Sequence, residues 1–294
     1  MMNGIINIYK EKGFTSFDVV AKLRGILKTR RIGHTGTLDP DAEGVLPVCI
    51  GKATKICELL TDKTKEYEAV MLLGRTTDTQ DVTGETQTQQ EVRCSAKEVE
   101  KAVLSFVGDY MQVPPMYSAL KVNGKKLYEL AREGKTVERK PRPVHFYEIE
   151  ILDIDFPLVR FRVTCSKGTY IRTLCHDIGE KLGCGAAMET LLRTKVGRFT
   201  LDDAITLAQT EEAVRNGEIE QRILGIEEIL AEYPRVCCTK EGDRLLANGN
   251  PLVQALVNAE EKDGWIRMCN SEGSFAGVYQ WDEKRDRYFP VKMF

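Results

Sequence analysis

The stretch from residue 33 to residue 47 constrains the fold of this chain more than any other, and we call it the Asp39 loop. It reads Gly-His-Thr-Gly-Thr-Leu-Asp-Pro-Asp-Ala-Glu-Gly-Val-Leu-Pro. Its glycines permit backbone conformations that other residues avoid, and Pro40 disfavours helical geometry at the residue before it. The polar residues between them cannot form a core. We therefore predict a rigid loop that displays the carboxylate of Asp39.

A calcium-binding loop fits this stretch poorly. Asp39, Asp41 and Glu43 stand at alternate positions, and Gly44 stands at the sixth position, as an EF-hand loop requires. The twelfth position is Ile50, where such a loop needs a glutamate that binds calcium through both oxygens. The spacing therefore argues against calcium.

A phosphate-binding P-loop fits no better. Gly51 and Lys52 are followed by Ala53 instead of Ser or Thr, and Leu46 stands where the first glycine belongs. On composition alone, an ordinary turn rich in Asp, Gly and Pro remains the alternative. The loop by itself therefore does not establish a catalytic role.

Capping residues and hydrophobic periodicity predict the regular elements of the first 232 residues. Thr15 with Asp18, and Ser95 with Glu98, have the spacing of capping boxes, which begin helices. Apolar runs predict strands at 5–9, 45–50, 66–73, 144–154 and 158–165. Further helices are expected at 53–60, after residue 170, within 185–199 and in the acidic section up to residue 232.

A change of pattern predicts a second domain after residue 232. The longer elements give way to short strand-like runs at 235–239, 265–270 and 275–281, with a helix expected at 240–247. We therefore predict two domains, residues 1–232 and residues 233–294.

Charge is distributed unevenly along the chain, although the formal net charge is only −2. Residues 10–31 hold seven Lys and Arg against two acidic residues, and residues 115–145 hold eight against three. Residues 200–232 hold nine acidic residues against two arginines. Two basic patches and an acidic face fit a surface that binds a polyanion, with solvated helix faces as the alternative.

Cysteine and histidine spacing argues against a structural metal. The nine cysteines include no Cys-x-x-Cys pair, and the three histidines do not stand at zinc-ligand spacing from them. We expect reduced thiols, as in a cytoplasmic protein. The chain shows no apolar run of membrane-spanning length and no signal-peptide pattern, so we expect a soluble protein that binds no membrane.

Three strings closely resemble signatures of the TruB family of tRNA pseudouridine synthases. They are the Asp39 loop, Pro-Pro-Met-Tyr-Ser-Ala-Leu-Lys at 114–121, and Gly-Thr-Tyr-Ile-Arg at 168–172. The resemblance implies an α+β fold, the pseudouridine-synthase fold, with a central, mostly antiparallel mixed sheet flanked by helices. The C-terminal part more weakly resembles a small, β-rich PUA-like RNA-binding domain. A β-rich appendage that stabilises the main domain is the alternative.

The resemblance also implies roles for individual residues. Asp39 is then the catalytic aspartate, and Arg172 pairs with it. Tyr67 packs against the target base, and Tyr170 lies near that base. Tyr170 is a candidate base for the last proton removal, or it only packs against the sugar.

Two further candidates lie close to the Asp39 loop. His34 is a candidate for filling the gap left by an extruded base or for stacking on it, and bracing of the loop by hydrogen bonds is the alternative. Lys10 matches a family lysine in the N-terminal turn, although Glu11 stands where that turn usually has proline. In the string Leu-Leu-Arg-Thr-Lys-Val-Gly, Leu192 replaces the first of two family arginines.

The reaction implied is the isomerisation of uridine to pseudouridine in the T-loop of tRNA, at tRNA position 55. Because redox level and composition do not change, we expect no cofactor. The reaction needs one carboxylate that acts as a nucleophile or as a base. We expect Asp39 to be ionised at neutral pH and oriented by Arg172.

The expected partner is the T arm of tRNA, bound by a monomer. Two alternatives stay open at this point. One is an RNA chaperone that folds tRNA without chemistry, and the other is a pseudouridine synthase that acts on another RNA.

Overall fold

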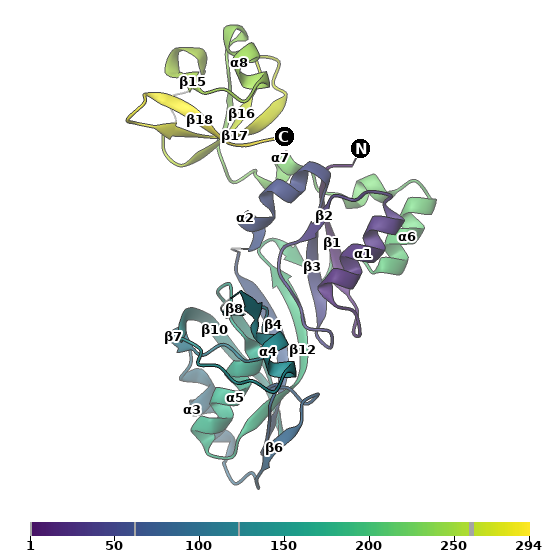
Figure 1. Cartoon of the computed structure of the whole chain (residues 1–294), viewed down its shortest axis with the longest axis vertical. Coiled ribbons are helices and arrows are strands. Elements are labelled where there is room, and N and C mark those ends of the chain that lie inside the picture. Colours follow the sequence, from purple (N-terminus) through teal and green to yellow (C-terminus); the bar gives the residue numbers. More distant parts are fainter. Residues whose placement is uncertain (1, 62, 123, 259–261) are drawn as a thin grey trace.

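The computed structural model describes residues 2–61, 63–122, 124–258 and 262–294 (Figure 1). Its centre is a nine-stranded sheet in which all pairs are antiparallel except β3 and β12, which run parallel. The predicted α+β fold with a mostly antiparallel mixed sheet is confirmed. The main strands, in spatial order, are β1 (Gly4–Lys10), β3 (Glu43–Ile50), β12 (Ala186–Val196), β4 (Lys65–Leu73), β11 (Leu158–Cys165), β10 (Arg142–Asp155) and β7 (Gly108–Gln112). The shorter β2 (Ile32–His34) pairs with β3, and β13 (Phe199–Thr200) pairs with β12.

Helices pack on two parts of this sheet. α1 (Ser16–Ile26) and α6 (Leu207–Arg215) lie together beside β1 and β3, and α3 (Ala96–Leu104) and α5 (Ile171–Leu182) lie together near β10 and β12 (Figure 1). The predicted capping boxes are present at the first residues of α1 and α3. The shorter helices are η1 (Gly51–Ile56), α2 (Cys57–Thr61), α4 (Leu127–Arg132), η2 (Ile219–Arg222) and α7 (Ile226–Ile229). Two small hairpins complete this part, β5 (Arg75–Thr77) with β6 (Thr86–Gln89), and β8 (Lys121–Val122) with β9 (Lys125–Lys126).

The helix predicted within 185–199 is wrong, because this segment forms the strand β12. Its sequence is rich in Ala, Leu, Met, Glu, Arg and Lys, which favour helices when only local structure is considered. In the folded chain it lies between β3 and β4 and pairs with both. Pairing with two strands that are distant in sequence therefore overrides the local preference.

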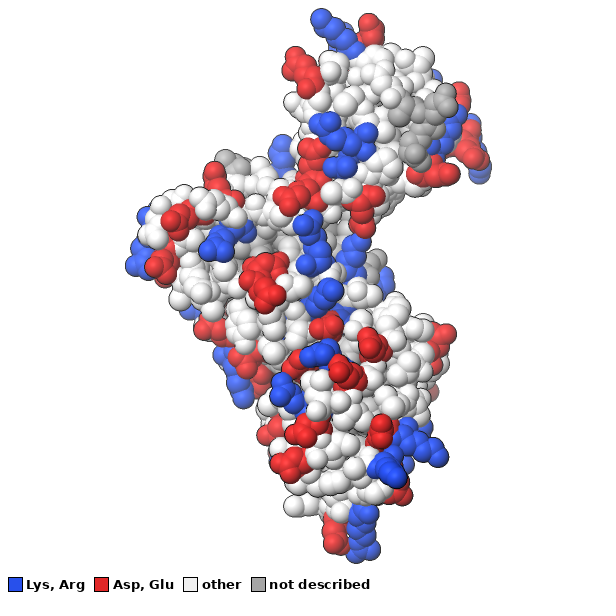
Figure 2. Space-filling model, turned by 180° about the vertical axis from the view of Figure 1, so that it is seen from behind, with Lys and Arg blue, Asp and Glu red and all other residues white. Residues whose placement is uncertain are grey.

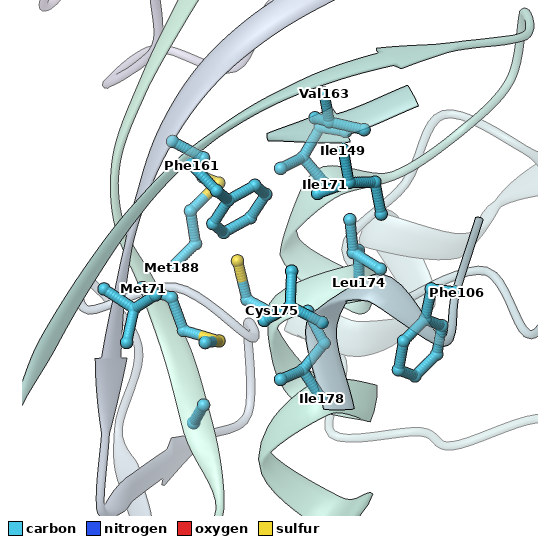
Figure 3. Packing of buried hydrophobic residues seen from close by; sticks show 14 of the residues in the cluster. Met71, Phe106, Ile149, Phe161, Val163, Ile171, Leu174, Cys175, Ile178 and Met188 are labelled. Atoms are coloured by element: carbon cyan, nitrogen blue, oxygen red, sulfur yellow. The ribbon is translucent and has the colours of Figure 1, made fainter. Parts of the chain in front are cut away.

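A hydrophobic cluster holds α5 against the sheet. Figure 3 shows Leu174, Cys175 and Ile178 of α5 beside Phe161 of β11 and Met71 of β4. All five side chains are fully buried. Burial of such side chains contributes about 1.5–3 kcal/mol for each large one. The cluster therefore fixes the first turn of α5, which carries the arginine of the third signature string.

The last part of the chain forms a separate five-stranded sheet, which lies at one end of the molecule (Figure 1). A hydrophobic cluster of its own lies within it, while Val278 joins a different cluster together with Ile5 and Val45 of the main sheet. The domain boundary at 232/233 stays a prediction. The elements of the chain after residue 233 are β14 (Arg235–Cys237), η3 (Lys240–Gly242), α8 (Asp243–Ala247), β15 (Leu252–Val253), η4 (Gln254–Leu256), β16 (Trp265–Cys269), β17 (Phe275–Asp282) and β18 (Arg287–Met293).

Within the described ranges, every helix is too short or too polar to cross a membrane.

Candidate active site

The ends of the Asp39 loop, as defined by sequence, belong to β2 and β3, and residues 35–42 between them join the two strands. Hydrogen bonds from the N-terminal segment hold this connection. Lys10 donates through Nζ to the Pro40 carbonyl at 3.1 Å. Ser16, the first residue of α1, donates through Oγ to the Leu38 carbonyl at 3.3 Å and accepts from the Leu38 N–H at 2.9 Å. These contacts fix the backbone on both sides of Asp39.

Arg172 contacts the Asp39 carboxylate through two nitrogens. Its Nε lies 3.0 Å from Oδ2, and its Nη2 lies 3.3 Å from Oδ1. The arginine side chain is 6% exposed, whereas the aspartate side chain is 41% exposed. A two-point, charge-assisted contact fixes the orientation of a carboxylate. The structure therefore brings together the two residues that the resemblance pairs, and it leaves the carboxylate accessible.

Three further groups hold the guanidinium of Arg172. Nη1 donates to the Thr79 carbonyl at 3.1 Å and to Asp81 Oδ2 at 3.4 Å, and Nη2 donates to the Tyr117 carbonyl at 3.0 Å. Asp81 was not predicted as a site residue, because its only signal in the sequence is its place in the polar loop after β4. Arg172 is thus shared between two carboxylates and is fixed by two backbone carbonyls.

The pKa of Asp39 is raised above its ordinary value. Burial is the main cause, because it disfavours the ionised carboxylate, and the negative charge of Asp81 adds to the rise. Arg172 and Lys10 oppose it with their positive charges. The charge of Arg172 therefore offsets the effect of burial only in part, and ionisation of Asp39 at neutral pH stays a prediction. A carboxylate with a raised pKa is a stronger base than one with the ordinary value.

Tyr67 lies on β4 and is almost completely buried, with 8% of its surface exposed. It belongs to the same hydrophobic cluster as Leu38 of the Asp39 loop. Burial raises the pKa of Tyr67, and the charge and hydrogen bond of Arg193 oppose that rise. Arg193 stands in the family string Leu-Leu-Arg-Thr-Lys-Val-Gly, in which the departure at Leu192 was noted but no role was predicted for the arginine. Tyr67 therefore packs with the loop in one hydrophobic cluster, and Arg193 of β12 lies opposite it in the sheet.

Tyr170 is the N-cap residue of α5 and is held by a residue that the sequence analysis also missed. Gln112 of β7 accepts from the Tyr170 N–H at 2.8 Å and donates to the Tyr170 carbonyl at 3.0 Å. Burial raises the pKa of the Tyr170 hydroxyl. Its phenolate form is therefore scarce at neutral pH, which weakens the candidate role as a base and favours packing.

His34 ends β2 and accepts a hydrogen bond from the Gly36 N–H through Nδ1 at 3.3 Å. Burial lowers the pKa of the imidazole, and the charge of Arg193 lowers it further. A neutral His34 that accepts from the loop fits the bracing alternative, and stacking on a base stays a prediction.

Lys10 ends β1 and has no exposed surface. Burial lowers the pKa of its ammonium group to about 8, against an ordinary value of 10.5. Besides Pro40, it donates to the Glu11 carbonyl at 3.2 Å. Lys10 therefore braces the Asp39 loop and does not contact the Asp39 carboxylate through any hydrogen bond recorded for the described residues.

The buried Lys10 predicts a pH-dependent contribution to stability. Between pH 8 and 10.5 the unfolded chain holds a proton on Lys10 that the folded chain lacks, so the free energy of unfolding rises with pH in this window. Lys10→Met removes this titration. Across this window, the free energy of unfolding of the parent should rise by on the order of 3 kcal/mol more than that of Lys10→Met. Urea unfolding at each pH measures both. A difference between the two proteins that stays constant with pH would contradict this prediction.

Two cavities lie away from this site. They have volumes of about 320 and 280 Å³ and are lined by residues of α3, by the segment before it and by the C-terminal end of α5. Neither is lined by Asp39 or Arg172. The Asp39 carboxylate is 41% exposed and stands on a loop that Lys10 and Ser16 brace.

Two family models match consecutive parts of the chain. The TruB family pseudouridylate synthase N-terminal domain matches residues 24–171, and the tRNA pseudouridylate synthase B C-terminal domain matches residues 172–231. The chain belongs to the TruB family. As a TruB-family pseudouridine synthase it is an isomerase, and the predicted enzyme class is confirmed.

Relatives of known name support this membership over the full length. The tRNA pseudouridine synthase B of Lachnoclostridium phytofermentans is 54% identical, with all of both chains covered. That of Bacillus cytotoxicus is 47% identical, with 97% of this chain and 94% of the relative covered. Among solved structures, a chain from a Cbf5-Nop10-Gar1 complex is 27% identical with a TM-score of 0.73, covering 99% of this TruB-family chain and 84% of that chain.

Proposed function

We propose that this TruB-family enzyme isomerises uridine to pseudouridine in the T-loop of tRNA, at tRNA position 55. The names of the full-length relatives support tRNA as the substrate. The observation that carries the chemistry is the Asp39 carboxylate, which is 41% exposed and held at two points by Arg172. This is the group from which the reaction starts.

The isomerisation breaks one bond and forms another. The bond from N1 of uracil to C1′ of ribose breaks, the freed uracil turns, and a bond forms from C5 to C1′. C5 then loses its proton, and N1 ends with a proton. Asp39 serves either as the nucleophile or as the base in this sequence, and Arg172 holds it in place without reacting.

The uridine must leave its RNA stack to reach Asp39. Extrusion costs a few kcal/mol, which packing of the base against protein side chains offsets. We propose that Tyr67 forms the floor of the base site, because it packs with the Asp39 loop in the same cluster as Leu38. Tyr170 then packs against the sugar, and His34 fills or braces the space at the loop's start.

RNA contact is proposed for the basic segment at 115–145 and for a PUA-like domain at 233–294. On the face seen in Figure 2, basic side chains lie among acidic ones along the whole length of the molecule. We propose that individual Lys and Arg side chains of these two parts contact the RNA phosphates. We propose that the enzyme works in the cytoplasm as a monomer, without a cofactor.

Tritium release tests the proposed target. RNA of a T arm is made with uridine tritiated at C5, and the tritium is released only when C5 becomes bonded to ribose. We expect release of one tritium per RNA from the uridine at position 55. A matched RNA with cytidine at 55 and tritiated uridines elsewhere should release none. Equal release from both RNAs would place the target elsewhere.

A further inference from the structure

Arg193 of β12 is a buried cation beneath the Asp39 loop. Only 1% of its surface is exposed. Nε donates to the Val45 carbonyl at 2.7 Å, and Nη2 and Nη1 make longer contacts with the carbonyls of Gly36 at 3.3 Å and Thr37 at 3.5 Å. One side chain therefore contacts the loop on both sides of Asp39.

Strand pairing places Arg193 in this position. It lies opposite Tyr67 in the antiparallel pair of β12 and β4, and opposite Gly44 in the parallel pair of β12 and β3. Gly44 has φ of +105°, and a Cβ there would lie 2.2 Å from the Arg193 carbonyl oxygen. Glycine at this position therefore allows the close approach that brings Arg193 under the loop.

Stability alone does not explain a guanidinium here. Burial lowers the pKa of Arg193, which means that its charged form is disfavoured in this environment. Among the described residues it donates hydrogen bonds to three backbone carbonyls, and no carboxylate pairs with it there. Tyr67 is its cross-strand neighbour. Removing an ion from water costs several kcal/mol, and an apolar side chain of similar size avoids that cost. The arrangement thus points to a role in the site.

We propose that Arg193 is a positioning residue for the reaction at Asp39. Its guanidinium donates hydrogen bonds to the loop that carries Asp39, and its backbone lies opposite Tyr67, on which the base is proposed to pack. Arg193 thus fixes the two relative to each other. The inference rests on the proposed roles of Asp39 and Tyr67. It adds that the orientation of this pair depends on a residue that contacts neither the RNA nor the Asp39 carboxylate.

The test compares Arg193→Met and Arg193→Lys with the parent. Arg198→Met is the matched control, because Arg198 follows on the same segment but is 52% exposed and contacts Glu228. Single-turnover pseudouridine formation at saturating tRNA is measured, together with the Kd for tRNA. We expect Arg193→Met to lower the rate roughly 100-fold, as small misplacements of a catalytic group do, with Kd changed by less than about 3-fold. Arg193→Lys should recover part of the rate, and the control should keep the parent's rate.

Two results would overturn the inference. One is a folded Arg193→Met or Arg193→Lys variant with the parent's rate. The other is a loss that lies entirely in Kd and disappears at saturating tRNA. If Arg193→Met does not fold, a double-mutant cycle of Arg193→Lys with Tyr67→Phe decides. We expect Arg193→Lys to cost less when the Tyr67 hydroxyl is absent, and effects that simply multiply would refute the link.

Asp39→Asn is measured in the same series, so that the two proposals can fail separately. If Asp39→Asn is inactive and Arg193→Lys is fully active, only the proposed role of Arg193 is refuted. An active Asp39→Asn removes the proposed catalytic role of Asp39, whatever the Arg193 variants show.

Discussion

Asp39→Asn should abolish tritium release from T-arm RNA, with a loss on the order of 10⁴-fold or more, because a reacting group is removed. The amide has nearly the same shape as the carboxylate, but it can neither attack carbon nor accept a proton. Binding of tRNA should survive.

Asp41→Asn is the control for this prediction. Asp41 lies two residues further along the loop and is exposed, so its variant removes the same charge from the same loop. We expect it to keep a rate close to that of the parent. If both variants lose activity equally, the loss reflects the charge of the loop and not a reaction at Asp39.

Arg172→Lys should lower the rate by about 100-fold with little change in tRNA affinity. Lysine keeps the charge, but its single ammonium cannot contact both oxygens of Asp39 and also reach Asp81 and the carbonyls of Thr79 and Tyr117. The carboxylate then keeps a nearby cation but loses its fixed orientation. Rate and affinity are measured separately to distinguish this from a binding defect.

The charge of Arg172 gives a second outcome for the same site. It lowers the pKa of Asp39 against the effect of burial, so Arg172→Met should let that pKa rise further. The acidic limb of the pH–rate profile should therefore move to higher pH in Arg172→Met and stay close to the parent's position in Arg172→Lys. Arg160→Lys is the control for the rate loss predicted for Arg172→Lys, because Arg160 is an exposed arginine that pairs with Glu68 on the sheet. A loss in Arg160→Lys as large as that in Arg172→Lys would contradict the prediction.

Local sequence was a good guide where an element's stability comes from neighbours along the chain. Thr15 with Asp18 and Ser95 with Glu98 make the predicted capping boxes, because cap and partner are only three residues apart. The alternating strand at 158–165 is also present as β11. β12 was missed because its partners, β3 and β4, lie far away in sequence, and its own residues favour a helix.

The site shows the same division. The resemblance of three short strings pointed to Asp39 and Arg172, which are 133 residues apart and meet in the fold. Asp81 and Gln112 belong to no such string, and Arg193 belongs to a fourth family string in which no role was predicted for it. All three contact those residues or their neighbours in the fold. Their importance becomes visible only once the strands have placed them.

By itself, the sequence determined which backbone the Asp39 loop can adopt, where capped helices begin and which residue types can carry the chemistry. These properties depend on glycine, proline and short-range hydrogen bonds, which act within a few residues. The tertiary structure alone decided that burial outweighs Arg172 in setting the pKa of Asp39, and that Arg193 lies beneath the loop. Desolvation and strand pairing depend on what distant segments bring together, and no local pattern records them.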